Sequence, residues 1–124
     1  MTAGEVIALT DALRPNQYAA AQKLRWLRRL DGQILAELEE THEPAAQAGE
    51  PSLPAVYDAE TELLAPFPYD EELYTAYLFC QIDLHNAEIQ KYNQSLTLLS
   101  AAWRQLADFL NRRRRPRGAA RWRC

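Results

Sequence analysis

Residues 70–92 read DEELYTAYLFCQIDLHNAEIQKY, and the fold is predicted from this segment outward. Asp70 is a favourable helix cap, and the two glutamates that follow it suit the positive end of a helix dipole. Apolar residues then recur at three- and four-residue steps, which predicts an α-helix. No charged residue occurs between Leu73 and Ile82, so this helix is expected to be covered on more than one side.

The apolar residues of this helix fall into two stripes. One runs from Leu73 through Tyr77 to Leu84 and is expected to face the core. The second is either further core or a surface for another protein chain, since aromatic residues occur in both. One small bundle can hardly cover both stripes, so we predict a subunit interface. It comprises Tyr69, Tyr74, Leu78, Ile82, Ile89 and Tyr92.

Two helices are expected before this stretch. Thr2 and Glu5 have the spacing of a capping box, which predicts a short helix that ends just before Pro15. A longer helix is expected to begin near the good cap Asn16 and to run to about Glu40, because apolar residues form a continuous stripe along it.

The remaining segments are a long loop and a fourth helix. Gly32 allows a bend or a split in the second helix, since glycine weakens a helix. Residues 42–68 contain five prolines and form a long connection, whose second half is apolar enough to lie against another surface as an extended arm. After a break at Asn93, a fourth helix should run to about Asn111, antiparallel to the third.

Charge is divided between two parts of the chain. Residues 1–111 carry 7 basic and 17 acidic residues, a net charge of −10, whereas residues 112–124 carry seven arginines and no acid. We therefore expect an all-α fold: a small bundle of about four helices in one domain, 1–111, with the loop 42–68, followed by a flexible basic C-terminal tail, 112–124. The acidic body should repel nucleic acid.

The basic tail has three interpretations. It is a solvated end, a nucleic-acid-binding segment that uses arginine for phosphates and tryptophan for stacking, or a segment that docks into an acidic or polar protein groove. We favour docking to a partner protein. The predicted contact residues are Arg112, Arg113, Arg114, Arg115, Arg117, Arg121, Trp122 and Arg123.

Little in the sequence points to catalysis or to a cofactor. His85 and Glu88 share a helix face, but a metal site needs more ligands than this pair. Cys80 lies on an apolar stripe, where cysteine usually packs as a small apolar side chain. No phosphate-binding loop or catalytic motif occurs. We predict no catalytic residue, no metal ligand, no cofactor and no enzymatic activity.

The class of compartment follows from simple features. Two cysteines are too few for a disulfide scaffold and fit a reducing interior. The first residues resemble no signal peptide, and charges interrupt every apolar run, so we expect a soluble protein without a membrane partner.

Two segments resemble a family of head–tail connector proteins, also called adaptor or head-completion proteins, of tailed phages and prophages. They are residues 61–74 (TELLAPFPYDEELY) and 77–95 (YLFCQIDLHNAEIQKYNQS). Residues 13–16 (LRPN) and 23–27 (KLRWL) fit the same pattern, so the resemblance spans most of the chain. The acidic segment 45–54 and the arginine-rich end do not match it.

The resemblance implies a helical subunit of a ring, usually a dodecamer, beneath the portal protein. Such a ring extends the DNA channel and provides the tail attachment surface, so its partners are other copies, the portal, and a tail-side connector or tail terminator protein. Genomic DNA would pass without specific binding, which suits an acidic body. The location implied is the head–tail interface of the virion, after assembly in the host cytoplasm. The alternative is a small nucleic-acid-binding or DNA-packaging accessory module that acts through the basic tail.

Overall fold

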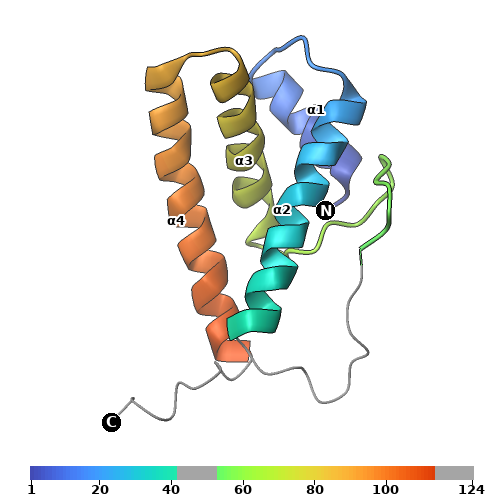
Figure 1. The fold of residues 1–124 in the computed structure, drawn as a ribbon, viewed down its shortest axis with the longest axis vertical. Coiled ribbons are helices and arrows are strands. Elements are labelled where there is room, and N and C mark those ends of the chain that lie inside the picture. Colours follow the sequence, from blue (N-terminus) through green and yellow to red (C-terminus); the bar gives the residue numbers. More distant parts are fainter. Residues whose placement is uncertain (42–52, 114–124) are drawn as a thin grey trace.

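The computed structural model describes residues 1–41 and 53–113. These residues form four helices and no strand: α1 (Ala3–Leu13), α2 (Ala20–Thr41), α3 (Asp70–His85) and α4 (Ile89–Arg113). A single isolated bridge pairs Thr2 with Glu62. The prediction of an all-α bundle is confirmed (Figure 1). Within the expected tail, the first two arginines belong to α4, and residues 114–124 lie outside the described residues.

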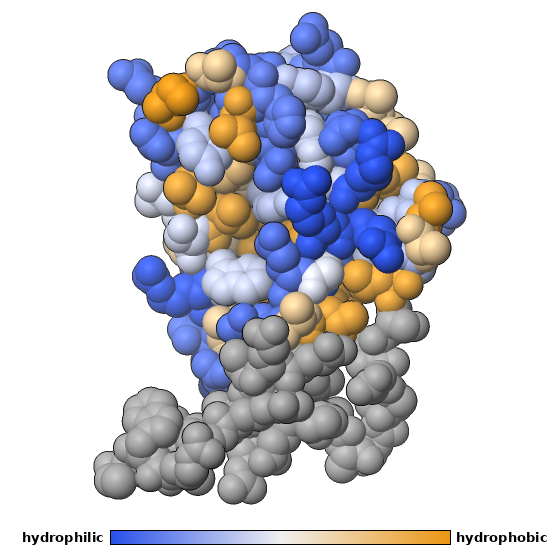
Figure 2. All heavy atoms as spheres, viewed as in Figure 1, coloured by the Kyte–Doolittle hydropathy of each residue, from blue (hydrophilic) through white to orange (hydrophobic). Residues whose placement is uncertain are grey.

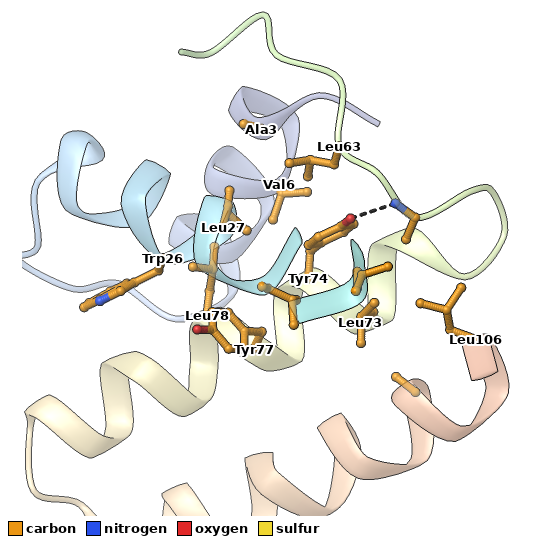
Figure 3. Packing of buried hydrophobic residues seen from close by; sticks show 14 of the residues in the cluster. Ala3, Val6, Trp26, Leu27, Leu63, Leu73, Tyr74, Tyr77, Leu78 and Leu106 are labelled. Atoms are coloured by element: carbon orange, nitrogen blue, oxygen red, sulfur yellow. Dashed lines mark hydrogen bonds between the residues drawn. The ribbon is translucent and has the colours of Figure 1, made fainter. Parts of the chain in front are cut away.

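Helix α3 is the centre of the bundle. It packs against α1, α2 and α4, with α4 running antiparallel to it as predicted (Figure 1). Residues of the arm 53–69 complete the cover, and nearly every side chain of α3 between Leu73 and Asp83 is buried (Figure 3). The expectation that one chain could not cover α3 is therefore wrong, because α1 and the arm cover it in addition to α2 and α4.

The surface that the arm lies against is the helical bundle of its own chain. Tyr57, Leu63 and Ala65 are buried among the core residues of the helices. The Tyr74 hydroxyl of α3 accepts a hydrogen bond from the Ala65 amide at 2.8 Å (Figure 3). Because these side chains replace water on one side of α3, the arm belongs to the core rather than to the surface.

Helix α1 begins and ends where the sequence predicts. Thr2 Oγ1 accepts a hydrogen bond from the Glu5 amide at 3.2 Å, and the Glu5 carboxylate accepts one from the Thr2 amide at 2.8 Å. These two hydrogen bonds lower the pKa of Glu5. The capping box is thus confirmed, and α1 ends at Leu13, before the Arg14-Pro15 dipeptide.

Helix α2 begins later than predicted. The Asn16 side chain accepts a hydrogen bond from the Tyr18 amide and donates to the Asp11 carboxylate, so Asn16 closes a turn after α1 instead of capping α2. The first regular turn starts at Ala20. Gly32 does not split the helix, since α2 is continuous from Ala20 to Thr41.

The ends of α3 also differ from the prediction. Its cap is Tyr69, and Asp70 is the first helical residue, whose carboxylate accepts a hydrogen bond from the Glu71 amide. The break between α3 and α4 lies at residues 86–88 rather than at Asn93. Ala87 there takes a positive φ of 58°, which few residues other than glycine adopt. The apolar pattern continues across this turn, so periodicity could not locate it.

Two glycines of the bundle should respond to alanine in opposite directions. At Gly4, a Cβ would lie 2.9 Å from the Ala59 carbonyl oxygen, so Gly4→Ala should lower the free energy of unfolding by about 1–3 kcal/mol. At Gly32, the nearest atom outside α2 is the Leu53 Cδ1 at 4.0 Å, so Gly32→Ala should raise it by about 1 kcal/mol. Urea unfolding measures both, and equal shifts in one direction would contradict the packing of the arm on α1.

Candidate functional site

An open groove lies between α2 and α4, with α3 as its floor. Helix α3 separates the two walls, whose backbones do not touch in the described residues. The groove encloses about 710 Å³, comparable to sites that hold small ligands or a few side chains of a partner. Its lining residues are Leu30, Gln33, Ala36 and Glu37 of α2, Tyr77 of α3, and Leu99, Ser100, Trp103, Arg104 and Ala107 of α4.

The α4 side of this face is apolar, and the stripe that makes it follows from helical spacing. Ile89, Tyr92, Leu96, Leu99 and Trp103 recur at three- and four-residue steps. Ile89 is 62% exposed and Leu96 is 40% exposed, whereas the others are half-buried. Figure 2 shows hydrophobic residues gathered on the α4 side of this face. Large apolar side chains left in contact with water on one stripe are typical of an interaction surface.

The α2 side of the same face is basic. Arg25 and Arg29 are exposed on α2, and Arg104 is exposed at the opposite lip on α4. Figure 2 shows strongly hydrophilic residues over α2 beside the apolar patches. Burial raises the pKa of the Tyr77 hydroxyl in the floor, although a hydrogen bond with Arg29 partly offsets this effect. One acid, the exposed Glu37, also lines the groove on α2, so three arginines and one glutamate surround its apolar interior.

The structure places the six residues of the predicted interface in three different environments. Tyr74, Leu78 and Ile82 are fully buried within the single chain, so this part of the prediction is wrong. Tyr69 is half-buried and its ring packs against Phe109, with centroids 4.8 Å apart. Ile89 and Tyr92 belong to the open stripe on α4.

Of the predicted tail contact residues, the structure describes only Arg112 and Arg113. Arg112 lies exposed in the last turns of α4, and Arg113 ends that helix. The other tail residues, from Arg114 to Arg123, lie outside the described residues. The sequence did not predict the groove. A signal for it was present, because the adjacent apolar residues Leu98 and Leu99 of α4 cannot both lie on one buried stripe.

The side chains with possible chemistry have structural partners. The His85 ring packs against Trp26, with centroids 5.1 Å apart, and the Glu88 carboxylate pairs with Lys91 at 3.0 Å. Cys80 is buried, and burial, together with the nearby Asp83, raises the pKa of its thiol to about 11. Within residues 1–41 and 53–113, no three His, Cys, Asp or Glu side chains are grouped to hold a metal ion.

Leu84 also differs from its predicted place. It is 49% exposed, although the sequence put it on the core stripe of the third helix. Leu84 lies in the last turn of α3, which ends at His85.

Comparison with family models, with curated proteins and with solved structures finds no match to this chain. Among the described helices, none has the length and apolar content to cross a membrane.

Proposed function

We propose that this chain is a structural subunit of a phage head–tail connector: a helical adaptor that assembles into a ring beneath the portal, extends the DNA channel and offers a surface for tail attachment. The resemblance of residues 61–95 to that family supports the proposal. Its strongest physical support is the open α2–α4 groove with the uncovered apolar stripe beside it. An assembly subunit needs such a surface to meet its neighbours.

The segments that carry the resemblance include the two turns that flank α3. Residues 66–69 form the turn that leads into α3, and residues 86–88 form the turn between α3 and α4. These turns specify the shape of the subunit, and each also carries an exposed apolar side chain or leads into one, Phe67 in the first and Ile89 after the second. Since α3 is closed within the chain, the support for assembly lies on α2 and α4.

The charge of the body suits a channel wall. Residues 1–111 carry a net charge of −10, which would let DNA pass without holding it. The arginine-rich tail could reach the portal, as the family pattern implies for a C-terminal segment.

Electron microscopy of the purified full chain, with and without the portal protein of the same phage, tests the proposal. We expect ring-shaped particles, either free or seated on the portal vertex. A chain that stays monomeric and does not bind the portal would refute it. A truncated chain that ends at Arg113 serves as a second sample, because loss of portal binding with an unchanged circular dichroism spectrum would assign the docking role to residues 114–124.

A further inference from the structure

Phe67 is the most exposed large apolar side chain of the described residues, at 86%. It lies between two prolines in the turn that precedes α3. Both flanks of this turn are fixed. The Ala65 amide donates to the Tyr74 hydroxyl at 2.8 Å, and the Tyr69 amide donates to the Pro66 carbonyl oxygen at 2.9 Å. A phenylalanine presented outward on a fixed turn loses little conformational freedom on binding, which is typical of an interface anchor.

The α2–α4 groove has the opposite shape. Its interior is formed by Leu30, Tyr77, Leu99 and Trp103, which offer an apolar and aromatic bed for an aromatic ring. Phe67 does not line the groove of its own chain. The chain therefore presents a projecting aromatic residue and an apolar hollow on two different surfaces.

The charges around the two surfaces are complementary. Glu71 and Glu72 follow the Phe67 turn in the first turn of α3, and both are exposed. No Lys or Arg occurs between Asp31 and Gln90, so the whole segment that carries Phe67 is acidic. Arg104 and Glu37 line the groove, and the exposed Arg29 lies beside its floor residue Tyr77, so basic residues outnumber the one acid there. An acidic projection and a basic rim attract each other, which favours this pairing over contact between two grooves.

We propose that the occupant of the α2–α4 groove is a second copy of this chain, which inserts its Phe67 turn. This inference rests on the proposed function and names the contact by which its subunits join. Because two different surfaces meet, the contact is head-to-tail, and repetition of such a contact produces a ring when the rotation closes. Trp103 would bury its exposed edge against the incoming ring and its flanking prolines.

The test uses two full-length variants that each remove one surface. Phe67→Ser removes the projection at an exposed position, and the double variant Ala36→Glu/Ser100→Glu places acids on both lips of the groove at exposed helical positions. Val56→Ser, at a side chain that is 80% exposed on the arm, is the control for the first variant. Gln94→Glu/Gln105→Glu adds the same charge to α4 outside the groove and is the control for the second.

Sedimentation velocity measures self-association of each variant, in the presence of portal if the free chain needs that template. We expect either surface variant to weaken association by at least about 30-fold, the scale of a lost anchor residue, while both controls associate as the wild type does. Circular dichroism checks that the helices are intact. Raising the salt concentration should weaken the wild-type contact, since the charges around it are exposed.

A mixture of the two surface variants gives the decisive result. Each keeps one intact surface, so an equimolar mixture should form a one-to-one complex that grows no further. A mixture that stays monomeric, or a Phe67→Ser variant that assembles normally, would overturn the inference. Rings that persist in Phe67→Ser would leave the connector function standing and remove only this contact. A wild-type chain that never assembles, even on the portal, would remove both. Capture of a different protein by the groove, with no self-association, would also overturn it.

Discussion

Replacing Asp31 with alanine is expected to lower the free energy of unfolding by about 3–5 kcal/mol, enough to unfold many small domains. Asp31 is fully buried on α2. Its carboxylate accepts hydrogen bonds from the Tyr57 hydroxyl at 2.6 Å, the Tyr74 hydroxyl at 2.5 Å and the Leu64 amide at 3.2 Å. Alanine would leave these three donors inside the protein without an acceptor, at about 1–3 kcal/mol each before relaxation.

The loss of the Asp31 carboxylate should free the arm from the bundle before the whole chain unfolds. Tyr57 and Leu64 belong to the arm, whereas Asp31 and Tyr74 belong to the helices, so the carboxylate ties the arm to the bundle. Hydrogen exchange at the Leu64 and Ala65 amides, combined with urea unfolding, measures both levels. An Asp31→Ala chain with wild-type stability would show that water replaces the carboxylate and that the arm is not held by it.

The same residue predicts a dependence on pH. Burial raises the pKa of Asp31, and the hydrogen bonds from the two tyrosines and Leu64 lower it by less. A folded-state pKa above the unfolded value means that the folded chain holds the proton more tightly. Its stabilising contribution is therefore full below the unfolded pKa and is lost as the pH rises through the folded pKa. Urea unfolding measured from acid to neutral pH should show that the free energy of unfolding of the wild type falls relative to that of Asp31→Asn, whose side chain at position 31 cannot titrate.

Replacing Arg14 with alanine is the second large expected loss, again about 3–5 kcal/mol. The Arg14 guanidinium lies 2.5 Å from the Asp83 carboxylate, which is fully buried, and 3.2 Å from the Ser95 hydroxyl. It also lies over the Phe79 ring, 4.3 Å from the centroid. One side chain at the end of α1 therefore joins α3 to α4. Without it, the Asp83 charge stays buried with only the Ser95 hydroxyl bond at 2.8 Å.

Two further variants separate the lost ion pair from a general surface effect. Lys91→Ala breaks the exposed Lys91–Glu88 pair and should change the free energy of unfolding by less than about 0.5 kcal/mol. The double variant Arg14→Met/Asp83→Leu removes both charges and should recover most of the loss, because no unpaired charge remains. If the double variant is as unstable as Arg14→Ala, the buried pair is not the cause.

The elements with strong local signals could be predicted. The Thr2 capping box, the central helix and the antiparallel fourth helix follow from spacing alone, because caps and helical stripes are set by residues within one or two turns of each other. The position of the α3–α4 turn could not be predicted, because Ala87 takes a left-handed conformation that its surroundings hold and that no sequence pattern indicates. The later start of α2 depended in the same way on the Asn16 contacts with Asp11 and Tyr18.

The candidate site, too, could be predicted only in part from the sequence. The sequence indicated more apolar surface than a lone helix can hide, and it placed Ile89 and Tyr92 on a surface that is still open to a partner. It assigned Tyr74 and Leu78 to that surface as well, because it could not tell which layers would cover α3. The outward position of Phe67 is invisible in a stretch that reads as apolar loop.

The chain by itself therefore determined the helical class, the order of the four helices and the separation of an acidic body from a basic end, since each depends on neighbours along the sequence. The tertiary structure alone decided which stripe is closed and which is open. It also decided that the charged residues Asp31, Asp83 and Lys23 are buried. Asp31 accepts hydrogen bonds from two tyrosines, and the other two form ion pairs. Burial and pairing depend on contacts between segments that are distant in the sequence, and the local spacing of residues carries no signal of such contacts.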